Sequence, residues 1–182
     1  MPNFLNKLLI CLIANQSTFD TIISTIEHFA RDSSDYPNAR LAISVLVRMT
    51  SVCGGPDQTA SSVTNPTSPT TSTAPLPGFD SFAVSRFSPL AWNIPASQGF
   101  NSKDPQARQV LLEVAALQAE ILKKVGSPYL ERLREELRDM GAQESQVEEY
   151  VRQLAGAIEG KGDAGKGWKG FFVRFVERGG GG

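Results

Sequence analysis

Apolar residues recur at three-and-four spacing along most of this chain, in one segment after another. The first clear segment spans residues 18–31, and its apolar positions are Phe19, Ile22, Ile23, Ile26 and Phe29. This spacing places apolar side chains on one face of an α-helix, whereas no stretch shows the sustained alternation that a half-buried strand requires. The pattern therefore predicts an all-α fold.

Turn signals separate the apolar segments and set the predicted ends of the helices. Three segments open with a polar residue and a first-turn proline, namely Asp35 and Pro37, Asp104 and Pro105, and Ser127 and Pro128. Glycines close the same three segments. Helices are therefore predicted over 39–52, 105–125, 128–140, 147–158 and 168–176, with another over 79–90 that Pro89 interrupts. Because such short turns let each helix pair bury its faces against the next pair, this order indicates an α-solenoid.

A segment rich in serine, threonine, proline and glycine lies between the two helical regions. Residues 54–77 hold one charged residue, Asp57, and too few apolar side chains to offset the entropy lost on ordering. We therefore predict helical repeats over 1–53, a disordered insert over 54–77, helical repeats over 78–178 and a glycine tail over 179–182. Mucin-like and phosphorylated forms of the insert stay open, because its composition does not discriminate between them.

The apolar run Leu8–Ala14 is the strongest candidate for a targeting segment. It could be the core of a signal peptide, but only Lys7 precedes it and no clean cleavage site follows, so a buried helix is favoured. No apolar run is long enough for a membrane span, and no membrane insertion is expected. Cys11 and Cys53 both lie in apolar helical patterns, which is typical of free thiols in a reducing compartment.

The charge balance bears on nucleic-acid binding. The formal net charge is −1 and the sequence pI is about 5.9, so the whole chain lacks the basic excess of most nucleic-acid binders. Any contact with RNA must come from local positive charge that anchors phosphates whatever the base sequence. The candidates, chosen by charge alone, are Arg40, Arg48, Lys123, Lys124, Lys161, Lys166, Lys169 and Arg174.

Two patterns near these candidates have both a functional and a structural interpretation. Trp168 lies between Lys166 and Lys169, as in a platform on which unpaired bases stack, but an aromatic stripe at helical spacing is more often core. We favour the core. The run of charges over 131–139 interleaves both signs at helical spacing, which is typical of a solvated face joined by weak ion pairs.

Enzymatic interpretations have weaker support. The spacing of Gly160, Gly165 and Lys166 matches part of a phosphate-binding loop. However, Gly167 stands where Ser or Thr would hold magnesium, and the preceding segment has a helical pattern, so a flexible linker between helices is favoured. The single histidine, His28, has no recognisable catalytic or metal-ligand spacing around it. We expect no catalytic centre, metal or cofactor.

Four phrases of the sequence are unusual: FDTIISTIEHFARDSSDYPNARL at 19–41, GFDSF at 78–82, RFSPLAW at 86–92 and DPQARQV at 104–110. Together they resemble the C-terminal region of fungal exportin-T, a member of the importin-β superfamily. The resemblance extends from the start of the chain to about Val176 and corresponds to a small part of such a receptor. It implies a superhelix of HEAT repeats.

The resemblance also implies a function. A receptor of this kind binds tRNA together with Ran in its GTP form in the nucleus, passes the nuclear pore proteins and releases its cargo in the cytoplasm, hydrolysing nothing itself. We expect this chain to be a portion that cannot export alone, with an exposed apolar edge on its N-terminal side. The alternative is a helical-repeat scaffold for protein interactions without a role in RNA binding, which the near-neutral charge permits.

Overall fold

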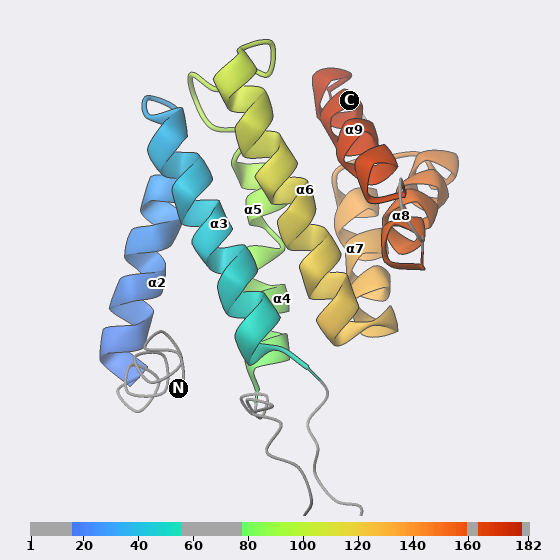
Figure 1. Cartoon of the computed structure of the whole chain (residues 1–182). Coiled ribbons are helices and arrows are strands. Elements are labelled where there is room, and N and C mark those ends of the chain that lie inside the picture. The colour runs from blue at the N-terminus through green and yellow to red at the C-terminus, as the bar shows by residue number, and fades with distance from the viewer. Residues whose placement is uncertain (1–15, 56–77, 160–163, 180–182) are drawn as a thin grey trace, which may run out of the picture.

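The computed structural model describes residues 16–55, 78–159 and 164–179, and within these ranges the chain forms α-helices and no strand. The helices are α2 (Gln16–Ala30), α3 (Tyr36–Cys53), α4 (Phe79–Phe87), α5 (Leu90–Asn93), α6 (Pro105–Val125), α7 (Ser127–Asp139), α8 (Glu144–Glu159) and α9 (Ala164–Glu177). In Figure 1, α3, α6 and α9 form a front layer, and the other helices lie behind it or at its sides. The predicted all-α stack is confirmed.

Helix α6 is the centre of this stack. It contacts α3 most extensively, and it also packs against α4, α5, α7, α8 and α9. The spacing predicts seven side chains on its inner face, and six of them are buried, namely Ala107, Val110, Leu111, Val114, Leu117 and Ile121. The seventh, Val125 at the end of the helix, is half-buried. Fully burying one side chain of this kind contributes about 1.5–3 kcal/mol, so α6 joins the helices on either side into one core.

Capping explains where α3 and α6 begin. The Asp35 carboxylate accepts a hydrogen bond from the backbone N–H of Asn38 at 3.1 Å, and that of Asp104 accepts one from Gln106 at 2.7 Å. Each cap satisfies a backbone donor that the helix itself leaves free. The same prediction for α7 is wrong, because Gly126 with φ 77° occupies the cap position and Ser127 is already the first helical residue.

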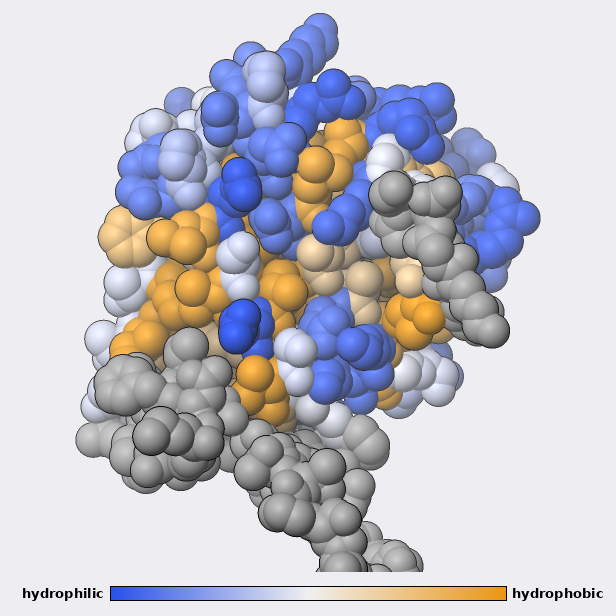
Figure 2. Space-filling view, in the orientation of Figure 1, coloured by the Kyte–Doolittle hydropathy of each residue, from blue (hydrophilic) through white to orange (hydrophobic). Residues whose placement is uncertain are grey.

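The apolar face of α3 is only partly covered. Leu41 and Val45, apolar positions of the helix predicted over 39–52, are exposed, Leu41 by 63%, and so is Phe29 of the neighbouring α2. Helix α3 packs on α2, α4 and α6, and these neighbours leave its remaining side open among the described residues. Figure 2 shows apolar surface gathered over the α2–α3 side. Met140 and Ile158, apolar positions of the helices predicted over 128–140 and 147–158, are exposed as well.

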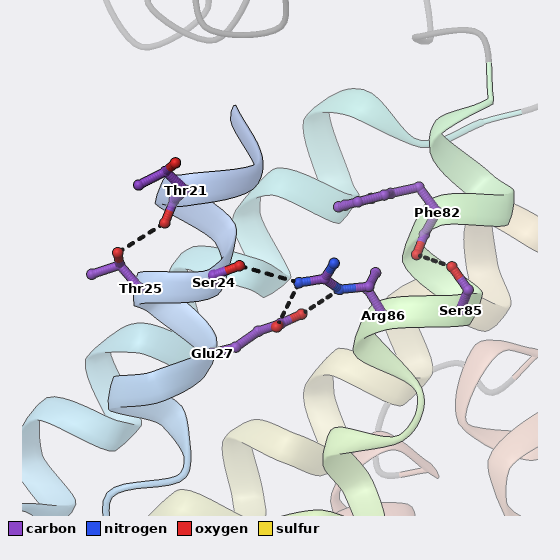
Figure 3. Close-up of polar contacts among 7 residues, drawn as sticks. All are labelled: Thr21, Ser24, Thr25, Glu27, Phe82, Ser85 and Arg86. Atoms are coloured by element: carbon purple, nitrogen blue, oxygen red, sulfur yellow. Dashed lines mark hydrogen bonds and ion pairs between the residues drawn. The ribbon is translucent and has the colours of Figure 1, made fainter. Parts of the chain in front are cut away.

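Two polar joints connect helices that are distant in sequence. Figure 3 shows the first, in which Arg86 of α4 binds Glu27 of α2 through two hydrogen bonds, Nε to Oε1 at 3.0 Å and Nη2 to Oε2 at 2.8 Å. The second is Glu136 of α7, whose carboxylate accepts hydrogen bonds from the side chains of Ser88 and Trp92, each at 3.0 Å. Bidentate and charge-assisted bonds of this kind fix helix positions strongly.

The second joint corrects one expectation. The charges of residues 131–139 are predicted on a solvated face, yet the side chain of Glu136 is only 11% exposed. The arginines of α7 do form ion pairs toward solvent, including Arg134 with Glu148 at 2.9 Å and Arg138 with Glu144 at 2.6 Å. Glu136 differs because α4 and α5 bring their donors against that part of α7.

Several predictions fall on residues that the structure does not describe. The helix and the alternative signal peptide around Leu8, with Cys11, lie outside the described residues, as does most of the predicted insert. The described residues on either side of this gap are joined, since the backbone N–H of Gly55 donates to Oδ1 of Asp80 in α4 at 3.1 Å. Among the helices described, none is long and apolar enough to cross a membrane.

Candidate nucleic-acid interface

Four of the basic candidates lie on the two central helices, α3 and α6. Arg40 Nε lies 3.7 Å from Glu113 Oε1, which joins α3 to α6. Lys123 Nζ lies 3.8 Å from Glu120 Oε1 within α6. Exposed pairs of this type contribute about 0–1 kcal/mol, so either side chain can exchange its partner for a phosphate at little cost.

Arg48 and Lys124 are the other two candidates on these helices, and within the described ranges neither has an ion-pair partner. Arg48 is exposed on α3. Lys124 is half-buried at the end of α6, where its aliphatic stem packs against Gly54 at the end of α3. A Cβ on Gly54 would lie 3.1 Å from Lys124 Cβ and 2.8 Å from Thr50 O, so only glycine allows this approach.

The remaining candidates belong to the C-terminal region. Lys161 lies outside the described residues, and Lys166 is placed in α9 by its backbone only. Lys169 is half-buried on α9, and Arg174 is exposed on the same helix. The structure therefore brings the basic candidates into two separate groups, one on α3 and α6 and one on α9, and not onto a single surface.

Trp168 is part of the core. Its side chain is 1% exposed, and its indole N–H donates to the backbone oxygen of Ala115 in α6 at 2.8 Å. Its ring meets Tyr150 of α8 edge to face, with ring centroids 5.1 Å apart. The core interpretation is confirmed, and a stacking platform at Trp168 is wrong because no base can reach a buried ring.

A groove that the sequence did not indicate lies between α8 and α9. It encloses about 320 Å³ and is lined by Phe171, Arg174 and Phe175 of α9 and by Arg178, which directly follows that helix. On the helical pattern alone these aromatics belong to the core, but both are only half-buried. The signal that could have revealed the groove is the pairing of two arginines four residues apart with two phenylalanines four residues apart.

The enzymatic candidates are not brought into any shared site in the described part of the chain. Gly165, Lys166 and Gly167 lie within α9, which begins at Ala164 inside the segment predicted as a linker, and Gly160 lies outside the described residues. His28 is exposed on α2, with its ring 5.9 Å from that of Phe29. No group of three His, Cys, Asp or Glu side chains among the described residues could hold a metal ion.

The remaining cysteine is a core residue. Cys53 is buried at the end of α3, and burial raises the pKa of its thiol to about 11. Since the thiolate is the nucleophilic form, this side chain is unreactive at neutral pH. Cys53 therefore contributes packing, as the sequence predicts for a thiol in an apolar pattern.

Comparison with known proteins gives one consistent family. The Exportin-T family model matches residues 1–180. Exportin-T of Phaeosphaeria nodorum is 59% identical over 90% of this chain and 16% of its own length, and Exportin-T of Emericella nidulans is 48% identical over 90% and 15%. Exportin-T of Aspergillus fumigatus is 50% identical over 78% and 14%. The chain thus spans only a small part of the length of these relatives.

No solved structure matches the chain significantly. The family model nevertheless covers almost every residue, and the described residues have the helical stack that the resemblance implies. This chain belongs to the Exportin-T family.

Proposed function

We propose that this chain forms the C-terminal portion of a nuclear export receptor that binds tRNA cooperatively with Ran in its GTP form. The receptor carries tRNA from the nucleus to the cytoplasm, meets nuclear pore proteins on the way and shuttles between the two compartments. The observation that carries this proposal is the Exportin-T family match over residues 1–180. The stack of helix pairs supports it, because solenoids of this type present long surfaces to large ligands.

The distribution of charge suggests how such a portion contributes. Structured RNA is recognised largely by shape and by its backbone, through phosphate contacts spread over a long surface. Two separate groups of basic side chains, on α3 with α6 and on α9, suit that mode better than a single deep pocket would. Any cooperation between Ran and tRNA must be reciprocal, so each would raise the affinity of the other by the same factor.

The test compares this chain with a full-length relative. Binding of labelled tRNA is measured for each protein with and without Ran loaded with GTP, over a series of salt concentrations. We expect Ran-coupled binding by the full-length protein, and weak, Ran-independent, salt-sensitive binding by this chain alone. A full-length protein whose affinity for tRNA does not change with Ran would contradict the proposal.

A scaffold for protein interactions without a role in RNA binding is the second candidate. The observation that favours it is the exposed apolar side chains Phe29, Leu41 and Val45, together with the ion pairing of two basic candidates. Apolar edges of this kind often serve as protein interfaces. In the same assay this function predicts no tRNA binding at physiological salt and partner binding that is insensitive to Ran.

A further inference from the structure

We propose that the groove between α8 and α9 binds an unpaired stretch of RNA, with phosphates on Arg174 and Arg178 and a base against Phe171 and Phe175. This inference rests on the proposed function and names a site for it on this chain. The sequence suggests a stacking platform of cations and a ring at Trp168. The structure instead places such a combination further along the chain, where Phe171 and Phe175 lie beside Arg174 and Arg178.

The two arginines supply the charge. Arg174 lies on α9, and Arg178 directly follows the helix, where its backbone N–H donates to the backbone oxygen of Arg174 at 3.1 Å and continues the helical turn. The two side chains are four residues apart and therefore on the same face, and both are exposed and line the groove. Neither has an acidic partner in the part of the chain that the structure describes, whereas most arginines of α7 and α8 do. Two unpaired guanidinium groups at this spacing suit consecutive phosphates, each of which can accept two hydrogen bonds from one guanidinium.

The two phenylalanines supply the apolar floor. The rings of Phe171 and Phe175 are nearly parallel, with centroids 6.1 Å apart and planes 29° apart, and both are half-buried. Each also meets the ring of Tyr150, at 5.9 Å and 5.0 Å. The hydroxyl of Tyr150 donates to Gln118 Oε1 at 2.6 Å, so the floor is supported by a fixed, buried side chain. Fixed aromatic faces are what unpaired bases stack on, whatever their sequence.

The opposite side of the groove, on α8, is polar and nearly neutral. Ser145, Gln146 and Glu149 line it. The Glu149 carboxylate forms an ion pair with Arg152 and accepts a hydrogen bond from Gln153 at 2.8 Å, so its charge is already compensated. The net positive charge of α9 therefore determines the electrostatics of the groove, and Ser145 and Gln146 add donors and acceptors for sugar or base.

These features favour unpaired RNA over two other anionic ligands. A double helix keeps its bases stacked inside, so they cannot reach half-buried rings in a groove. An acidic peptide satisfies the arginines but presents no flat group to the phenylalanines. Unpaired RNA supplies a phosphate and a flat base at every step, which matches the two arginines and the two phenylalanines together.

The first test removes the positive charge. Binding of a fluorescent, unstructured eight-nucleotide RNA to the full 182-residue chain is measured by anisotropy at several salt concentrations. In the double variant Arg174→Gln with Arg178→Gln, we expect about 10-fold weaker binding and a salt slope reduced by about 1.4, since each phosphate contact to a single strand contributes about 0.7. The matched control is Arg31→Gln with Lys103→Gln, which removes two exposed, unpaired charges elsewhere and should change binding less than about 2-fold.

The second test removes a ring. Phe171→Leu keeps an apolar side chain but loses the flat face, and we expect binding weaker by about 5-fold or more at an unchanged salt slope. Circular dichroism and thermal unfolding check that this variant is folded. If it is not, the double arginine variant, which changes only exposed side chains, still decides the question.

Three results would overturn the inference. The double arginine variant could bind like its control, a blunt double-stranded RNA could bind as tightly as the single strand, or a polyglutamate peptide could compete as well as RNA does. In each case the proposed function can still stand, because it is judged by Ran-coupled tRNA binding in the full-length relative. If that coupling is absent while the groove binds the RNA, the proposed function is contradicted but the RNA-binding role of the groove is supported.

Discussion

The α2–α3 end and the α8–α9 end of the stack are held together by different chemistry. At α8–α9, a cluster of aromatic rings around Tyr150 and Trp168 is packed against α6, and arginines cover its outer side. At α2–α3, the joint to α4 is a charge pair between the buried Glu27 and the partly exposed Arg86, and Leu41 is left exposed. Both ends bury apolar side chains against the core, but only the α8–α9 end covers its aromatic cluster with arginines, whereas the α2–α3 end buries a carboxylate and leaves apolar side chains exposed.

This difference indicates that the two ends are suited to different neighbours. Covering an exposed apolar edge with another protein surface stabilises the complex by about 25 cal/mol per Å² of apolar area that is buried. An aromatic floor under unpaired arginines attracts anions and flat groups instead.

Replacement of Trp168 by alanine tests the aromatic end. It removes a large buried side chain together with the hydrogen bond to Ala115, so we expect the free energy of unfolding to fall by about 3–5 kcal/mol. Urea denaturation followed by circular dichroism measures it. Trp168→Phe is the control, since it retains most of the packing, and it should lose clearly less. A loss below 1 kcal/mol in the alanine variant would show that the rings do not hold α9.

The reactivity of Cys53 tests whether the end of α3 is closed. Burial raises the pKa of this thiol from its usual 9.0 to about 11, so at pH 8 the thiolate is about 100-fold scarcer in the folded chain than in urea. Alkylation by iodoacetamide, followed at Cys53 by mass spectrometry, should be slower by at least that factor when folded. Because the folded pKa is raised, the associated stability is complete below pH 9 and is lost as the pH rises towards 11. Equal rates in both states would mean that this end opens freely.

Replacement of Glu27 by glutamine tests the charged joint of α2 with α4. It leaves Arg86 without its anionic partner, but this guanidinium is partly exposed and water can solvate it. We therefore expect a loss of about 2 kcal/mol, below the 3–5 kcal/mol of a fully buried pair. Chemical denaturation provides the measurement. The exposed Glu135 offers a matched control, because Glu135→Gln should change stability by less than about 0.5 kcal/mol. Equal losses of unfolding free energy in the two variants would show that the pair between Glu27 and Arg86 stabilises the fold no more than an exposed ion pair does.

Replacement of Leu41 by asparagine should have the smallest effect on stability. The side chain is 63% exposed, so we expect a change within about 0.5 kcal/mol. Binding of a hydrophobic dye and self-association in sedimentation experiments should both decrease, because apolar surface is lost from the α2–α3 edge. The buried Leu46 on the same helix is the contrast, since Leu46→Asn should destabilise the chain strongly. A large loss of stability at Leu41 would mean that this edge is covered.

The sequence predicts the fold well where local rules act. Asp35 and Asp104 are found as caps, and the predicted inner face of α6 is buried, because capping and helical spacing depend on residues close together in the chain. Helical spacing fails for Leu41 and Val45. It shows which side chains share a face, but it does not show whether another helix lies against that face.

The candidate site was predicted less well. Charge alone predicts Arg174, whereas helical spacing places its neighbours Phe171 and Phe175 in the core. Only the groove shows that Arg178 lies beside them. Glu136 was assigned to a solvated face, although Ser88 and Trp92 bind it across the stack. These side chains meet through contacts between helices that are separated by tens of residues, which no local pattern encodes.

The sequence alone determined that this chain is helical, where its capped helices begin and to which family it belongs, because these depend on local spacing and on recognisable phrases. Only the tertiary structure decided which apolar faces are covered, that Trp168 is core, and that the basic candidates form two groups. The physical reason is that burial and charge pairing depend on which helices pack together. The order of helices in the chain leaves that choice open.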